Sequence, residues 1–141
     1  IYYPPFMKRA GDYEVTLSVD EIEELLLYLS DKGVYAFNPS KAKAAKVANQ
    51  RAITQRARSG QGELFYRSDD TATTLRVNLS AYTPKGKDAK TIQNYSKEIK
   101  WFGLQSDSRD HPDIESISDL ADAEKAVLVY CEHANLKKVT K

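Results

Sequence analysis

Basic side chains are concentrated in residues 41–58, which hold six lysines or arginines and no acidic residue. Lysine and arginine bind nucleic acid mainly by neutralising its phosphates, so this stretch is a candidate nucleic-acid-binding segment. Bases in the following hairpin and loop could extend the same surface. The candidate binding residues are Lys41, Lys43, Lys46, Arg51, Arg56, Arg58, Arg67, Lys85, Lys87 and Lys90.

Three tyrosines, Tyr66, Tyr82 and Tyr95, lie close to these bases in the sequence and could stack on the bases of a single strand. They could equally be core or cross-strand residues of a hairpin. The sequence pI near 8.0 is below the value of about 9 above which basic nucleic-acid modules usually fall. An alternative interpretation is therefore that residues 41–58 form only the solvated side of a helix.

Acid–base catalysis would have to use the two histidines. His111 follows Asp110, and His133 follows Glu132, so each imidazole has a carboxylate neighbour in the sequence. Such a pair could act as a small metal-independent nuclease, but nothing in the sequence brings the two imidazoles together. We expect a non-enzymatic accessory protein and keep the nuclease as a further alternative.

Motifs that hold metals or cofactors are incomplete in this sequence. Cys131 and two histidines cannot build a zinc site of the multi-cysteine type. The acids of residues 107–115 lack the glycine and the bidentate glutamate of a calcium-binding loop. Gly60 and Gly62 are not followed by the Lys-Ser/Thr pair of a phosphate-binding loop. The sequence therefore predicts no cofactor and no metal.

Opposite charges occupy separate blocks, although the formal net charge is only +1. Residues 10–31 hold seven acids and no base, a net charge of −7, whereas residues 32–67 hold eight bases and one acid, a net charge of +7. Such blocks suggest opposed surfaces. A second hypothesis is thus a self-associating protein–protein interaction module, in which the two blocks pair between copies.

The composition indicates a globular intracellular protein. Apolar residues make up 41% and charged residues 29% of a 141-residue chain, which suits one domain. A single cysteine excludes an internal disulfide, so we expect a cytoplasmic or otherwise intracellular location. No apolar run approaches the roughly 20 residues that span a bilayer, and residues 1–6 lack the basic leader of a signal peptide. We expect no membrane association.

The elements that would position these residues begin with an extended arm. We expect it to pack on its own domain, and docking on a neighbouring molecule is the alternative. A strand at residues 12–17 follows, and Ser18 and Glu21 form a capping box that starts a helix ending at Gly33. Residues 34–37 are predicted as a short strand. The basic helix should start at the N-cap Ser40.

The wheel of the basic helix places four alanines on one arc, where another backbone could approach closely. Lys43 and Lys46 are expected on the far side, facing solvent. The four alanines are Ala44, Ala45, Ala48 and Ala52.

The second half of the chain is predicted as a hairpin followed by helices. Residues 63–67 and 72–82 should pair as strands. Residues 91–102 should form a helix, with a strand at 98–102 as the alternative. A polar, turn-rich stretch at 105–112 precedes a long C-terminal helix, for which a strand at 126–131 is the alternative.

These elements predict an α+β fold with a small, mainly antiparallel sheet covered by three or four helices. The sheet would contain the strands near 12–17, 34–37, 63–67 and 72–82. We expect one domain over residues 1–141. Its parts are an extended arm at 1–11, an α+β core at 12–104, and a polar loop with the C-terminal helix at 105–141.

Overall fold

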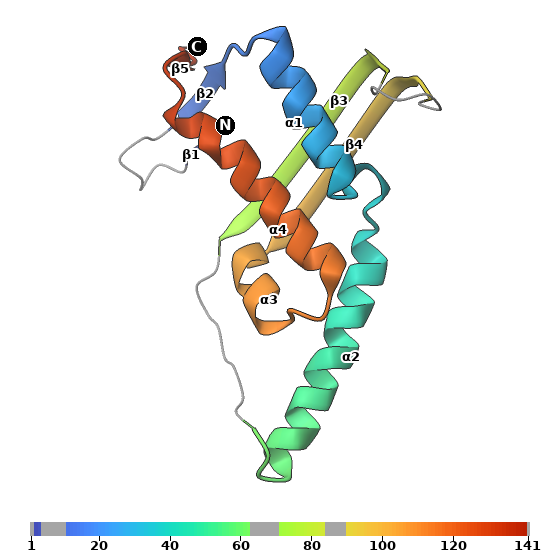
Figure 1. The fold of residues 1–141 in the computed structure, drawn as a ribbon. Helices are drawn as coiled ribbons and strands as arrows, with labels where there is room; N and C mark the ends of the chain where they lie inside the picture. The colour runs from blue at the N-terminus through green and yellow to red at the C-terminus, as the bar shows by residue number, and fades with distance from the viewer. Residues whose placement is uncertain (1, 4–10, 63–70, 84–89, 141) are drawn as a thin grey trace.

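The chain combines helices with antiparallel strands in the computed structural model, which describes residues 2–3, 11–62, 71–83 and 90–140 (Figure 1). The elements are β1 (Tyr2–Tyr3), β2 (Gly11–Val15), α1 (Val19–Asp31), the 3-10 helix η1 (Val34–Ala36), α2 (Pro39–Arg58), β3 (Ala72–Tyr82), β4 (Ile92–Phe102), α3 (Leu104–Asp110), α4 (Glu115–Leu128), the 3-10 helix η2 (Val129–Glu132) and β5 (Leu136–Lys138). The predicted α+β class with small antiparallel sheets is confirmed.

Helix α1 begins and ends where its sequence signals predict. The Ser18 hydroxyl accepts the Glu21 backbone N–H at 3.2 Å, and the Glu21 carboxylate accepts the Ser18 backbone N–H at 2.8 Å. This reciprocal pair is the predicted capping box. After the helix, Gly33 has φ = 66°, the left-handed conformation that glycine adopts without a Cβ penalty.

The segment between α1 and α2 is not the predicted strand. Residues Val34–Ala36 form a 3-10 helix, and Val34 and Phe37 are buried in the core. Helix α2 then starts at Pro39, and its N-cap is Asn38, whose side chain accepts the Lys41 backbone N–H at 3.0 Å. The predicted N-cap Ser40 is wrong, because proline fits the first helical position and asparagine caps at least as well as serine.

Strand β3 confirms the prediction at 72–82, but its partner among the described residues is β4, with Ala72 opposite Phe102 and Tyr82 opposite Ile92. The predicted partner, residues 63–67, lies outside the described residues. The helix predicted at 91–102 is wrong, and the strand alternative at 98–102 covers only the end of β4. Ile99 and Trp101 face the core in strand alternation, whereas Phe102 is exposed.

The predicted single sheet is two separate sheets in the described chain. One has the strand order β1-β2-β5 and the other is the β3–β4 ribbon. The backbone of Tyr2–Tyr3 pairs with Gly11 and Asp12, so this part of the arm packs on its own chain, as predicted. Strand β5 pairs with β2 and was not predicted.

The C-terminal part contains one more helix than the sequence predicts. Residues 104–110 form α3 instead of turns, after Gly103 with φ = 68°. The long helix is confirmed as α4, and the alternative strand at 126–131 is wrong, since that segment continues through α4 into η2.

The core lies where α1, α3 and α4 meet one face of the β3–β4 ribbon (Figure 1). Its centre includes Leu29 of α1, Ile99 and Trp101 of β4, and Ile117 and Leu120 of α4. Helix α2 enters this core only at Ala42, and its later turns extend beyond α3 and α4 in Figure 1. Among the described helices, none is both long and apolar enough to cross a membrane.

Candidate nucleic-acid interface on helix α2

Helix α2 carries its cations on a 20-residue scaffold that has no acidic residue. Lys41, Lys43, Arg51, Arg56 and Arg58 are all exposed. None of the five forms an ion pair with a carboxylate of the described residues. Their charges are therefore left to attract a partner of opposite sign.

Lys46 does not belong to this exposed set, and the prediction that it faces solvent is wrong. Its Nζ lies 2.7 Å from Oδ2 of Asp107, which is 6% exposed. The same oxygen accepts the indole N–H of Trp101 at 2.7 Å. Lys46 thus ties α2 to α3 and β4. The carboxylate of Asp107 neutralises its charge, while 36% of the Lys46 side chain is exposed.

The face of α2 that packs is also different from the predicted one. Ala42 is buried in the core, and the Asn49 amide donates to Asp113 at 2.8 Å, so the contacts with the C-terminal half lie on the Ala42–Lys46–Asn49 side. Ala44, Ala45 and Ala48 are exposed. Three of the four alanines of the predicted arc therefore face solvent, and Ala52 is half-buried, because polar contacts from Lys46 and Asn49 fix the other side of α2 against the protein.

Three arginines occupy the last turns of α2. A helical residue turns by about 100°, so Arg51 and Arg58 lie within about 20° of each other, whereas Arg56 lies about 140° from Arg51. Arg56 and Arg58 also lie in the last turn, where the helix dipole favours positive charge. Arg51 and Arg58 thus share one side of α2, whereas Arg56 lies on another side.

Two other predicted binding residues, Lys43 and Lys90, lie far apart in the structure. Lys43 Nζ lies 6.0 Å from the centre of the Trp101 ring, near the end of β4. Lys90 precedes the start of β4, and strands rise about 3.4 Å per residue, so roughly 35 Å of strand separates it from Trp101. The structure does not bring Lys90 to α2. Arg67, Lys85 and Lys87 lie outside the described residues.

The predicted stacking platform is not available at Tyr95. The Tyr95 hydroxyl donates to the carbonyl of Tyr35 at 3.0 Å, and the two rings meet edge to face at 5.5 Å. Burial raises the pKa of Tyr95, and burial, with smaller contributions from neighbouring tyrosines, raises that of Tyr35 to about 12. Both side chains are therefore structural.

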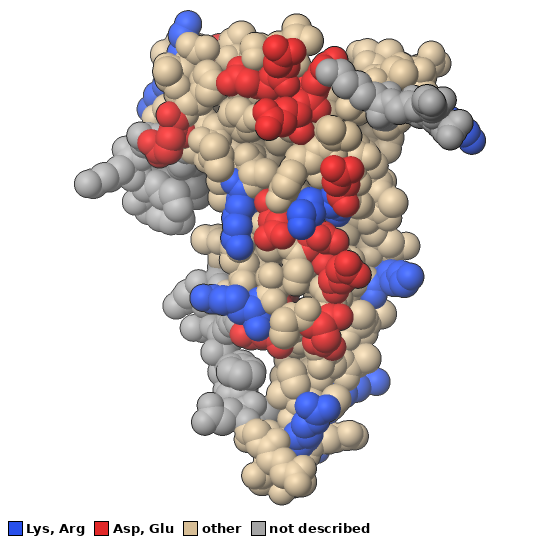
Figure 2. Space-filling view, viewed as in Figure 1, with Lys and Arg blue, Asp and Glu red and all other residues tan. Residues whose placement is uncertain are grey.

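Tyr82 lies in acidic surroundings that do not suit a nucleic acid. It lines a groove of about 350 Å³ together with Asp20, Glu23 and Glu24 of α1. Figure 2 shows acidic side chains gathered at the end of the molecule formed by α1, and cationic side chains along the part formed by α2. Tyr66 lies outside the described residues.

The histidines cannot act together as an acid–base pair. They flank α4, whose 14 residues span about 21 Å at 1.5 Å per residue. Both ring nitrogens of His133 are engaged: Nδ1 accepts the Asn135 N–H at 3.1 Å, and Nε2 therefore donates to Glu21 at 3.0 Å. His111 is 2% exposed and its Nδ1 has no hydrogen-bond partner among the described atoms.

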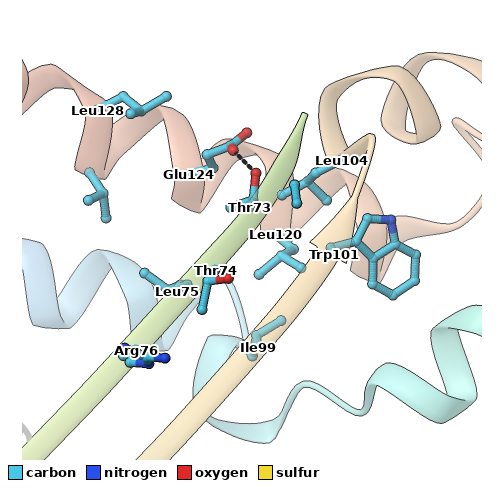
Figure 3. A pocket seen from close by; sticks show the side chains of 12 residues that line it. Thr73, Thr74, Leu75, Arg76, Ile99, Trp101, Leu104, Leu120, Glu124 and Leu128 are labelled. Atoms are coloured by element: carbon cyan, nitrogen blue, oxygen red, sulfur yellow. Dashed lines mark hydrogen bonds between the residues drawn. The ribbon is translucent and has the colours of Figure 1, made fainter. Parts of the chain in front are cut away.

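A groove of about 400 Å³ lies between β3 and α4 (Figure 3). Its one carboxylate, Glu124, accepts hydrogen bonds from the Thr73 hydroxyl and from Gln105 Nε2, the latter at 2.5 Å. The groove is otherwise lined mainly by apolar side chains, including Ile99 and Leu120. Glu124 is thus held as a structural acceptor, which explains an acid on the apolar side of α4.

The described residues contain no group of three or more His, Cys, Asp or Glu side chains placed to hold a metal ion. No family model, curated protein or solved structure matches this chain. The exposed cations of α2 are therefore the feature of the described surface that suggests a function.

Proposed function

We propose that this protein is a non-enzymatic nucleic-acid-binding protein that uses the exposed cations of α2. The observation that supports this function is a set of five exposed bases on a helix without acids, none of which forms an ion pair with a carboxylate of the described residues. They are Lys41, Lys43, Arg51, Arg56 and Arg58. Phosphate neutralisation needs cations that are distributed along a surface and can reach solvent, and α2 offers both.

The test is to measure affinity for 20-nucleotide single- and double-stranded oligonucleotides while salt is raised from about 50 to 300 mM. If up to five phosphates are neutralised, log affinity should fall with log salt with a slope between about −2 and −4.5 on a DNA duplex. An affinity that is absent even at 50 mM salt would overturn the proposal. A slope near zero would exclude phosphate contacts as its basis.

A second candidate function is self-association through opposite charges. Acidic side chains gather at the α1 end of the molecule and also lie in the middle of the face shown, whereas cationic side chains lie along the α2 part (Figure 2). Burial raises the pKa of Tyr130 in this acidic region, and the charges of Glu21 and Glu24 raise it further. Light scattering at low salt tests this candidate: a monomer at high protein concentration would end it.

A further inference from the structure

We infer that α2 binds double-stranded DNA by lying in the major groove, an inference that rests on the proposed nucleic-acid-binding function. In this arrangement, the residues of α2 that face the bases follow one another at spacings of three and four residues. They therefore form a stripe along one side of the helix. The groove stripe consists of Ala44, Ala48, Arg51, Gln55 and Arg58, and all five are exposed.

The shape of α2 suits this groove. An α-helix with its side chains is about 10–12 Å across, and the major groove of B-form DNA is about 12 Å wide. Ala44 and Ala48 make the helix narrow on the side that would enter. The later turns of α2 extend beyond α3 and α4, so these helices do not block the approach (Figure 1).

The chemistry of the stripe and its flanks fits a duplex. Arg51 and Arg58 carry the donors that pair with guanine, and the Gln55 amide can pair with adenine. Lys43 lies to one side of the stripe on the helical wheel, and Lys41 and Arg56 lie to the other. Phosphates line both walls of the groove, so cations on both sides can contact them while the stripe faces the bases.

Other occupants fit this face less well. A second copy of α2 would bring positive charges against positive charges. Protein interfaces depend on buried aromatic or arginine anchors in an apolar core, but Val47, 50% exposed, is the only large exposed apolar side chain described on α2. A single strand would need stacking side chains, and Tyr95 is already held in the protein.

The first experiment compares nucleic acids that differ only in the groove. Four probes of the same sequence are compared. Two are a plain 20-bp DNA duplex and the same duplex with its major groove filled by glucosylated hydroxymethylcytosine. The others are the plain DNA duplex with its minor groove filled by a netropsin-type drug, and an RNA duplex. We expect affinity to fall at least tenfold for the filled major groove and for RNA, whose major groove is too narrow for a helix. The drug should change affinity less than threefold.

Each other outcome has a distinct consequence. Equal affinity for all four probes would overturn the groove inference and leave nucleic-acid binding intact. Binding to poly-glutamate but to no nucleic acid would overturn both proposals and indicate an acidic protein as the partner. The full 141-residue chain is used throughout.

The second experiment adds bulk on the stripe. Ala48→Leu should weaken binding to the plain DNA duplex at least fivefold, because a larger side chain keeps the backbone out of the groove. Ala45→Leu is the matched control, since Ala45 is also exposed but lies on the adjoining side of α2, and it should change affinity less than twofold. Equal effects of the two variants, with unchanged circular dichroism, would contradict the inference.

Discussion

Lys46 and Arg51 carry the same charge on the same helix, but their surroundings give them different roles. Lys46 is held by the carboxylate of Asp107, which also accepts the Trp101 indole N–H. Arg51 is exposed and forms no ion pair with a described carboxylate. The charge of Lys46 therefore stabilises the fold, whereas that of Arg51 is available to a partner.

Paired substitutions separate these two roles. Lys46→Met should lower the free energy of unfolding by about 1–3 kcal/mol, because a nearly buried carboxylate loses its cation. It should leave DNA affinity within twofold of wild type. Arg51→Met should do the opposite, with stability within about 0.5 kcal/mol and affinity reduced severalfold. Urea unfolding and fluorescence anisotropy of labelled DNA measure the two quantities.

A dependence of stability on pH is expected from Glu21. The Ser18 backbone N–H, followed by the His133 side chain, lowers the pKa of this carboxyl below 4.5. A lowered folded pKa stabilises the protein above the unfolded value, and this contribution is lost as pH falls through the folded pKa. The difference in urea midpoint between wild type and Glu21→Gln should therefore be largest near neutral pH and shrink below pH 4.5.

The control for this pH effect is Glu24→Gln, because Glu24 is exposed on the same helix and has no hydrogen-bond partner among the described residues. Its midpoint should run parallel to that of wild type across the same pH range. A Glu21→Gln difference that stays constant down to pH 3 would contradict the assignment.

Contacts between residues that are close in the sequence could be predicted from it, whereas contacts between residues far apart in the sequence could not. The capping box joins residues three apart, so its spacing is visible in the sequence. The Lys46–Asp107 pair joins residues 61 apart, and nothing in either local sequence indicates the other. Of the ten predicted binding residues, the structure places five together on α2, namely Lys41, Lys43, Arg51, Arg56 and Arg58.

At the scale of elements, a helical wheel tells which residues share a face but not which face meets the core. The alanines of α2 were grouped correctly, but Ala44 and Ala48 face solvent and Ala42 packs. The same ambiguity affected β4, where Ile92, Tyr95, Ile99 and Phe102 match a helical spacing by coincidence. Residues 92–102 form a strand because they pair with β3, and a local sequence pattern does not show such tertiary pairing.

Leucine substitutions on α2 test which face packs. Ala42→Leu should destabilise the protein by about 1–3 kcal/mol, because Ala42 is 3% exposed and adding three carbons at a packed position forces its neighbours to shift. Ala44→Leu should change stability by less than about 0.5 kcal/mol, because Ala44 is exposed. Thermal or urea unfolding followed by circular dichroism measures both. Equal losses would contradict the assigned orientation of α2.

At the scale of the whole molecule, the two charge blocks of the sequence become two regions of the surface. The acidic block forms much of the α1 end, and the basic block forms α2 (Figure 2). If the proposed function is correct, a long polyanion should be attracted to the α2 region and repelled from the α1 end, so the protein should bind DNA in one orientation. Block charges were therefore a useful guide to surfaces, although they overcounted the available cations. They include Lys32, which pairs with Asp119 and Asp122, and Lys46, which pairs with Asp107.

The most direct test of the α2 interface is a charge removal with a matched control. The variant Arg51→Gln/Arg56→Gln/Arg58→Gln removes three exposed cations from α2. The control Lys100→Gln/Lys137→Gln/Lys138→Gln removes three exposed cations from β4 and β5 and leaves the same net charge. Affinity for a 20-bp DNA duplex at 100 mM salt should fall at least thirtyfold in the α2 variant and less than threefold in the control. Equal losses in the two variants would contradict an interface on α2.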